Sequence, residues 1–156
     1  MTLESFNASP PGEAVAVMLS CCASRRFADA MASGRPYASL AAAQTATRAV
    51  FESLTWDDVL EAMSEHPRLG ARAGGQSAAE QSGVADSSRA ALAEGNARYE
   101  ERFGHVFLIC ATGLSGEQMR AALGERLGND SATERAVTTT ELEKITLLRV
   151  AKALGP

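Results

Sequence analysis

His66 is the residue of this sequence best suited to carry a proton at neutral pH. It is one of two histidines in the chain, and an unperturbed imidazole titrates near pH ~6.5. Pro67 disfavours helical geometry in the residue before it, so the sequence predicts a helix end at His66. The imidazole would then stand beside Arg68 and a glycine-rich stretch. Taken alone, however, the motif is more typical of a surface loop than of a catalyst.

A second group of chemically useful residues follows at Ser77, Glu80 and Gln81. A serine followed three residues later by a glutamate is typical of a capping box at the start of a helix. Capping does not explain Gln81, whose amide group both donates and accepts hydrogen bonds. If the pair faces inward, an ionic acceptor next to an amide suits a ligand that carries ureido or amide groups.

Arg149 is the third candidate, on the last predicted helix. At about 100° per residue it projects between Leu142 and Ile145, and Leu148 is predicted to flank the same apolar face. A guanidinium in this position either extends to solvent or is buried to meet an anionic ligand. Arg126 is an alternative candidate for facing the substrate, and the sequence does not choose between the two.

The sequence argues against several other kinds of active site. Its two histidines and three cysteines show no Cys-x-x-Cys or His-x-x-x-His spacing, so we expect no metal site. It contains neither the glycine motifs that bind phosphates or dinucleotides nor the Gly-x-Ser-x-Gly turn of serine hydrolases. His105 precedes an apolar run and is predicted to pack or to cap rather than to react.

The composition limits the classes of protein to which this chain can belong. The 156 residues suit one domain, and 5% aromatic residues with abundant alanine favour close-packed helices. A net charge of −4 without a run of basic residues argues against nucleic-acid and membrane partners. The odd number of cysteines indicates a reducing compartment. Because neither a signal peptide nor a long apolar span is evident, we expect a cytoplasmic protein.

Hydrophobic periodicity predicts an all-α fold over residues 1–156, a single compact domain of roughly eight helices with no significant sheet. Residues 105–111 are predicted to be buried, as helix or as extended chain, because one strand alone cannot form a sheet. The final helix is predicted to begin with a cap formed by Ser131 and Glu134. The predicted helical segments are 10–22, 25–32, 40–54, 55–66, a short turn at 77–81, 86–101, 115–127 and 131–154.

These motifs occur together in a family that the chain resembles nearly from end to end, the 2-oxo-4-hydroxy-4-carboxy-5-ureidoimidazoline (OHCU) decarboxylases of urate breakdown. The specific part is the pair formed by His66-Pro67-Arg68-Leu69-Gly70 and the later Ser77-x-x-Glu80-Gln81. The other matching stretches are Asn7, Cys22-Ala23-Ser24-Arg25, Arg35-Pro36-Tyr37, Asn96-x-x-Tyr99-x-x-Arg102-Phe103-Gly104, Phe107-Leu108-Ile109-Cys110-Ala111, Arg126-Leu127-x-Asn129 and Glu141-x-x-x-Ile145-x-x-x-Arg149.

The resemblance implies an all-α enzyme, commonly a homodimer, that converts this small-molecule substrate to (S)-allantoin and carbon dioxide without a cofactor. It implies that His66 is the acid/base catalyst, that Glu80 and Arg149 also occupy catalytic positions, and that Pro67 lines the pocket. The remaining implied substrate contacts are Ser77, Gln81 and the backbone of Phe107, Leu108, Ile109, Cys110 and Ala111.

Two other functions stay open from the residues alone. One is a hydrolase of a related ureido compound, which would use His66 as a base toward water. The other is a non-catalytic helical module that binds a purine-derived ligand or a partner helix. Release of carbon dioxide would separate a decarboxylase from the hydrolase, and binding of allantoin without turnover would favour the module.

Overall fold

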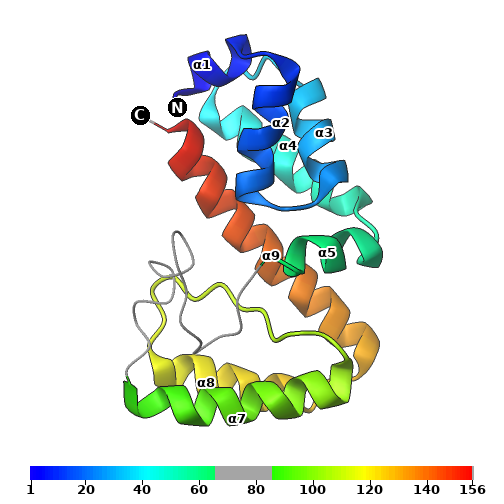
Figure 1. Cartoon of the computed structure of the whole chain (residues 1–156), viewed down its shortest axis with the longest axis vertical. Helices are drawn as coiled ribbons and strands as arrows, with labels where there is room; N and C mark the ends of the chain where they lie inside the picture. Colours follow the sequence, from blue (N-terminus) through cyan, green and yellow to red (C-terminus); the bar gives the residue numbers. More distant parts are fainter. Residues whose placement is uncertain (66–85, 156) are drawn as a thin grey trace. The chain divides into compact units, whose positions relative to one another are not determined.

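The computed structural model describes residues 1–65 and 86–155, with side chains described up to Glu65 and from Arg89 onward. Eight helices and no strand lie within these residues (Figure 1), which confirms the all-α expectation. No helix among them is long and apolar enough to cross a membrane. The helices are α1 (Leu3–Ala8), α2 (Pro11–Cys21), α3 (Arg25–Ser33), α4 (Leu40–Ser53), α5 (Trp56–Met63), α7 (Asp86–Phe103), α8 (Gly116–Arg126) and α9 (Ser131–Leu154).

Reciprocal capping boxes begin two helices where the sequence predicts them. At the start of α8, the Ser115 hydroxyl accepts from the Gln118 N–H at 3.2 Å, and the Gln118 side chain accepts from the Ser115 N–H at 2.8 Å. Thr55 and Asp58 exchange the same pair of bonds at the start of α5. Each box satisfies two backbone donors that have no partner within the helix.

The start of α9 differs from the prediction. Asp130, not Ser131, is the cap, because its Oδ1 accepts from the Thr133 N–H at 2.7 Å. Glu134, expected to complete a capping box, is fully buried and forms an ion pair with Arg126. The predicted box was wrong because a buried guanidinium offers the carboxylate stronger, charge-assisted hydrogen bonds than a backbone N–H does.

One helix and one helix end also differ from the prediction. The short helix α1 precedes the first predicted helix and is capped by Thr2, whose side chain accepts from the Ser5 N–H. Helix α5 ends at Met63 rather than at His66, because Ser64 closes it: its N–H and its hydroxyl both donate to the Glu61 carbonyl. The predicted glycine-rich loop and the turn at 77–81 lie outside the described residues.

The described helices form two compact units. The first comprises Met1–Glu65 and Leu142–Pro156, and so contains α1 to α5 and the C-terminal part of α9. The second comprises the described residues of His66–Glu141, which include α7, α8 and the N-terminal part of α9. The expectation that residues 1–156 form one domain stays a prediction.

The core of the first unit is built from long apolar side chains of α2, α3 and α4. Met18 and Phe27 are fully buried, and the Phe27 ring meets the Phe51 ring edge-on at a centroid distance of 5.8 Å. On α9, Leu142 and Ile145 are buried as predicted, but Leu148 is 47% exposed. The prediction for Leu148 was wrong because it lies about 100° around the helix from Arg149, outside the buried arc.

Two motifs of the first unit have structural roles. The Asn7 amide binds both backbone groups of Tyr37, with its Nδ2 donating to the carbonyl and its Oδ1 accepting from the N–H, each at 2.9 Å. Arg35 donates to the carbonyls of Phe6, Ser9 and Ala32, each at 2.8 Å. These side chains satisfy backbone groups at the ends of α1 and α3, so we assign Asn7 and Arg35 to the fold.

In the second unit, α7 and α8 lie side by side (Figure 1) and approach closely at Gly95. A Cβ atom at this position would lie 2.3 Å from Cδ2 of the buried Leu123. The absence of a side chain at Gly95 therefore permits the contact between the two helices. The core around it consists of Leu92, Tyr99, Phe107, Ala111, Met119 and Leu123.

The segment between α7 and α8 is non-helical and belongs to no strand, which excludes the helical alternative and leaves the extended one. It begins at Gly104, which ends α7 with φ +78°, and turns at Gly113, with φ +82°. Both values lie in the left-handed region that glycine adopts at little cost. Phe107, Leu108 and Ala111 are buried along it, as the apolar run predicts.

The contrast between Gly95 and Gly124 provides a test of the α7–α8 packing. Gly124, on α8, would place a Cβ with no heavy atom within 4 Å. We expect Gly95→Ala to lower the free energy of unfolding by about 1–2 kcal/mol through overpacking. Gly124→Ala should raise it by about 0.5–1 kcal/mol through helix propensity. Denaturant unfolding measures both, and shifts of the same sign would contradict the close approach.

Candidate functional site

The predicted site residues divide between described and undescribed parts of the chain. His66, Pro67, Ser77, Glu80 and Gln81 lie outside the described residues, so their roles stay predictions. The others are described: Arg149 belongs to the first unit, and the segment from Phe107 to Ala111 belongs to the second.

The segment from Phe107 to Ala111 alternates in the manner of a strand. Phe107 and Ala111 belong to the core between α7 and α8, and Ile109 packs against that core. Residues spaced by two along extended chain point to the same face, so these three side chains fix that face. Leu108, which is also buried, and Cys110 do not belong to that core. The backbone that was predicted to contact substrate is therefore anchored by its own apolar side chains.

Two charged side chains hold backbone groups of this segment. The Arg126 Nη1 donates to the Leu108 carbonyl at 2.6 Å, and the Glu141 Oε1 accepts from the Cys110 N–H at 3.1 Å. These side chains take the place of a neighbouring strand, since buried backbone groups require partners. The segment is thus extended chain that side chains, rather than a sheet, hold in position.

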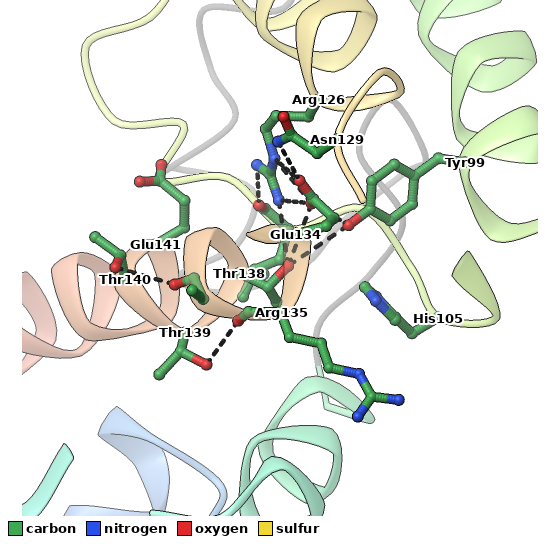
Figure 2. A network of polar contacts seen from close by, with 12 residues as sticks. Tyr99, His105, Arg126, Asn129, Glu134, Arg135, Thr138, Thr139, Thr140 and Glu141 are labelled. Carbon is green, nitrogen blue, oxygen red and sulfur yellow. Dashed lines mark hydrogen bonds and ion pairs between the residues drawn. The ribbon is translucent and has the colours of Figure 1, made fainter. Parts of the chain in front are cut away.

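Arg126 is itself fixed by a buried ion pair with Glu134 (Figure 2). Its Nη2 lies 2.6 Å from Glu134 Oε2, and its Nε donates to the same oxygen at 3.0 Å. The Asn129 amide donates to Glu134 Oε1 at 3.1 Å, and the Tyr99 hydroxyl donates to Oε2. Arg126 is 7% exposed and Glu134 is fully buried. The network joins α7, α8 and α9.

The electrostatics of the network keep Glu134 ionised. Burial alone would raise its pKa, but hydrogen bonds from Arg126 and Tyr99 outweigh that effect, so the pKa of this carboxyl lies below its ordinary value. Burial, together with the nearby Glu134 carboxylate, raises the pKa of Tyr99. The guanidinium also lies over the Phe107 ring, with Cζ 4.4 Å from the ring centroid, a favourable cation–π geometry.

These contacts bear on which arginine faces the substrate. All three guanidinium nitrogens of Arg126 donate to groups of the protein: the Glu134 carboxylate, the Leu108 carbonyl and the Thr138 hydroxyl. Such a guanidinium holds the fold together and has little capacity left for a ligand. The geometry therefore favours Arg149 over Arg126 as the arginine for the substrate, as a prediction that stays open.

Sequence reasoning did not find Glu134 or Glu141 as partners of the candidate site. Glu134 matched a capping pattern, and its real partner stands eight residues earlier on another helix. Glu141 contacts a backbone N–H 31 residues away. Pairings across helices leave no periodic signal in one sequence. The available hint was the resemblance, because Arg126, Asn129 and Glu141 belong to its matching stretches.

His105 packs in the second unit, as the sequence predicts. Its ring is half-buried beside Tyr99 and Phe103, at centroid distances of 5.4 and 6.2 Å. Its Nδ1 lies 3.1 Å from the Val106 carbonyl. An imidazole held among aromatic rings contributes packing area, and this arrangement gives no reason to assign it chemistry.

Arg149 lies half-buried on α9, where its charge acts on Cys21 and Cys22 at the end of α2. Burial raises the pKa of the Cys21 thiol to about 11 and also raises that of Cys22, and the positive charge of Arg149 opposes both shifts. Both thiols are free of disulfides. They stay protonated at neutral pH and do not supply Arg149 with a negative charge.

No group of three His, Cys, Asp or Glu side chains within residues 1–65 and 86–155 is arranged to hold a metal ion. A groove of about 520 Å³ in the first unit is lined by side chains of α1, α2 and α3 and by Arg35 and Pro36. None of the residues predicted to act on the substrate lines this groove.

Comparison with known proteins identifies relatives along most of the chain. A sequence model of OHCU decarboxylase matches residues 7–151. The uric acid degradation bifunctional protein TTL of Arabidopsis thaliana is 38% identical over 147 residues, which cover 85% of this chain and 44% of that protein. The 2-oxo-4-hydroxy-4-carboxy-5-ureidoimidazoline decarboxylase of Amia calva is 47% identical over 55 residues, which cover 35% and 31%. The chain thus spans less than half the length of these two relatives.

A solved structure resembles the fold closely. The crystal structure of OHCU decarboxylase in the presence of (S)-allantoin is 34% identical to this chain and superposes with a TM-score of 0.79. The match covers 88% of this chain and 96% of that one, so the likeness extends over nearly the whole of the solved protein.

The ionised state of Glu134 yields a prediction about acid stability. A carboxyl whose pKa is depressed by folding stabilises the protein above its unfolded value of 4.5, and this contribution is lost as the pH falls. We expect Glu134→Gln to lower the free energy of unfolding at pH 7 by about 3–5 kcal/mol, because Arg126 loses its buried counter-charge. The difference between wild type and variant should shrink as the pH falls below 4.5.

Chemical unfolding at a series of pH values measures this difference. Glu125→Gln is the matched control, because Glu125 is an exposed residue of α8 and its loss should change stability by less than ~0.5 kcal/mol. A Glu134→Gln protein with wild-type stability at pH 7, or an equal difference at all pH values, would rule out the buried ion pair.

Proposed function

The chain belongs to the OHCU decarboxylase family, and we propose that it decarboxylates 2-oxo-4-hydroxy-4-carboxy-5-ureidoimidazoline to (S)-allantoin and carbon dioxide. The observation that carries this proposal is the family match over residues 7–151. It is supported by the 34% identical structure determined in the presence of (S)-allantoin. The enzyme would be a carboxy-lyase of urate degradation.

The reaction requires the protein to orient the substrate and to transfer protons. The bond between the ring carbon and the carboxylate breaks and carbon dioxide leaves. The electron pair passes through the neighbouring C=N bond to the ring nitrogen, which takes up a proton. The hydroxyl on the same carbon loses its proton and becomes a carbonyl, and a proton added to one face of the ring sets the S configuration. Because the ring itself accepts the electron pair, the step proceeds without a cofactor.

We assign the proton transfers to His66, because an unperturbed imidazole changes its charge near neutral pH. General acid–base catalysis of this kind contributes about 10²- to 10⁴-fold in rate. Glu80 would either hold one tautomer of His66 or bind an N–H of the ureido group. Ser77 and Gln81 would bind the polar groups of the substrate, and Pro67 would line the pocket.

Arg149 has a more restricted role in this proposal. A guanidinium clamped on the departing carboxylate would stabilise the ground state, whereas only stronger binding of the transition state accelerates the step. We therefore place Arg149 against an oxygen that gains negative charge, where a fixed positive charge is most effective. Its half-buried position on α9, beside protonated thiols, is compatible with an anionic partner from the substrate.

Two further properties belong to the proposal. We propose a homodimer, on the strength of the family resemblance, and a cytoplasmic location, because three free cysteines suit a reducing compartment. Analytical ultracentrifugation tests the first, and fractionation of cells that produce the protein tests the second.

The central test replaces His66. We expect His66→Asn to fold normally and to lose about 10²- to 10⁴-fold in the rate of stereoselective allantoin formation. The measurement is circular dichroism of freshly generated substrate, because uncatalysed decay gives racemic, and therefore optically silent, product. The matched control is His105→Asn, which replaces the other histidine of the chain and should keep the wild-type rate.

The outcomes separate the candidate functions. Full activity in a folded His66→Asn protein would refute the assignment of the acid/base. Cleavage of the ureido group without release of carbon dioxide would identify a hydrolase. Allantoin binding by a wild-type protein that turns over no substrate would identify a binding module.

A second test replaces Arg149 by lysine. The substitution keeps the positive charge and removes the planar pair of donors, so we expect kcat to fall by about 10-fold or more, as when a preorganised hydrogen-bond donor is removed. Matched measurements on Arg48→Lys, an exposed arginine of α4 in the same unit, should give wild-type kinetics. Unchanged steady-state kinetics in Arg149→Lys would remove this residue from the site.

A further inference from the structure

The groove of the first unit combines an apolar wall with polar side chains, as small-molecule sites do. Its volume of about 520 Å³ is also in the range of such sites. Pro11 and Val15 of α2 line it together with Ala32 of α3. Asp29 and Ser33, also of α3, stand four residues apart and therefore share one face of that helix. The groove thus places hydrogen-bonding groups beside a surface on which the carbon atoms of a ligand can pack.

Arg35 brings a guanidinium to the same groove. Its Nε donates to the Ala32 carbonyl, and its Nη1 donates to the carbonyls of Phe6 and Ser9, each at 2.8 Å. These bonds fix the plane of the group, whose Cζ lies 5.4 Å from the centroid of the Phe6 ring. The third nitrogen, Nη2, donates to no group of the described residues. The fold therefore uses two nitrogens of Arg35 and leaves the N–H groups of the third for a ligand.

The charges around the groove are unequally balanced. Within the described part of the chain Arg35 takes part in no ion pair, whereas other arginines of the first unit pair with Asp29 and Asp58. A half-buried guanidinium without a counter-charge favours an anion beside it. Asp29 has its charge balanced already, because its Oδ1 lies 3.2 Å from Nε of Arg25. The Oδ2 atom of Asp29 is thus better suited to accept from a neutral N–H group than to bind a second cation.

We propose that this groove binds a small monoanionic carboxylate that carries amide or ureido N–H groups. The carboxylate accepts from Nη2 of Arg35, whose positive charge is not balanced by the protein. The N–H groups donate to Oδ2 of Asp29, and the Ser33 hydroxyl can donate to or accept from either end of the ligand. The apolar wall from α2 contacts the carbon atoms between the two polar ends.

Binding in this groove goes beyond the proposed decarboxylation and does not depend on it. Arg35 and Asp29 were not predicted to act on the substrate, and none of the residues with such a predicted role lines the groove. A ligand that binds only the folded chain stabilises it. We therefore expect this ligand to raise the thermal stability of the protein in proportion to its occupancy, with or without turnover.

The test uses N-carbamoylglycine as the probe, because this molecule joins one carboxylate to one ureido group. Its analogue N-carbamoylglycinamide replaces the carboxylate by a neutral amide and keeps the ureido group. Each compound is titrated into the full chain, and calorimetry gives its dissociation constant. In parallel, ¹H–¹⁵N spectra follow the side-chain resonances of Arg35 and the backbone amides of the residues that line the groove.

Two substitutions change the groove without removing a hydrogen bond of Arg35. Ser33→Trp fills the space, and its control Ser53→Trp changes an exposed serine of α4 in the same unit. Asp29→Ala removes the acceptor, and its control Glu52→Ala removes an exposed carboxylate of α4. Circular dichroism shows whether each variant is folded.

We expect N-carbamoylglycine to bind the wild type with a dissociation constant of about 1 mM or lower, which a ligand of about eight non-hydrogen atoms can reach. Its binding should shift the Arg35 side-chain resonances in a saturable manner. The amide analogue should bind about 10-fold more weakly or worse, because it lacks the charge-assisted hydrogen bond. Asp29→Ala should weaken binding about 3-fold or more, and Ser33→Trp should abolish it. Both control variants should bind as the wild type does.

Several results would overturn the proposed site. They are the absence of saturable Arg35 shifts in the wild type, binding that persists in Ser33→Trp, and equal affinity for the amide analogue. Shifts that disappear in His66→Asn would place the probe at the site proposed for the reaction instead. A wild type without decarboxylase activity would count against the proposed function alone, because binding of the probe is measured without turnover.

Discussion

The buried ion pair between Arg126 and Glu134 is the interaction on which the second unit depends. Removing two charges from water is costly, and such a pair is tolerated only when further hydrogen bonds satisfy the remaining donors and acceptors. Here Tyr99 and Asn129 donate further hydrogen bonds to the carboxylate. The Leu108 carbonyl and the Thr138 hydroxyl accept further hydrogen bonds from the guanidinium. Because these partners come from α7, α8, α9 and the extended segment, the pair constrains the position of all four together.

The extended segment illustrates why an all-α protein needs such a network. Chain without helical hydrogen bonds exposes its peptide groups, and a helical fold offers no neighbouring strand to pair with them. Apolar side chains at Phe107, Ile109 and Ala111 fix one face of the segment against the helices. Charged side chains then hold its backbone from one edge. The result is a non-helical segment that is fixed by apolar side chains on one face and by two charged side chains at its backbone.

The sequence predicted those features whose signals are local. The helix starts predicted at residues 55 and 115 are confirmed, and in the structure each is fixed by a capping box, that is, by contacts within a few residues. The same local reasoning assigned Glu134 to a helix cap, because a serine three residues earlier is typical of a capping box. No signal in the neighbouring residues indicates its buried partner, Arg126. It also placed Leu148 on the apolar face of α9, whereas this side chain is 47% exposed. What could not be predicted are contacts across 18 to 35 residues, such as Arg126 to Leu108 and Tyr99 to Glu134.

The two arginines considered for the substrate, Arg126 and Arg149, have different surroundings in the structure. Arg126 has its charge neutralised by Glu134 and its donors spent on the fold, so its field at a ligand is weak, and its value lies in rigidity. Arg149 sits near thiols that stay protonated, so those neighbours leave its field at an anion undiminished. In the proposed decarboxylation the two arginines would have separate tasks. Arg126 would keep the extended segment rigid, because its donors are taken by the fold. Arg149 would act on an oxygen that gains charge and not on the departing carboxylate, since only stronger binding of the transition state accelerates the step.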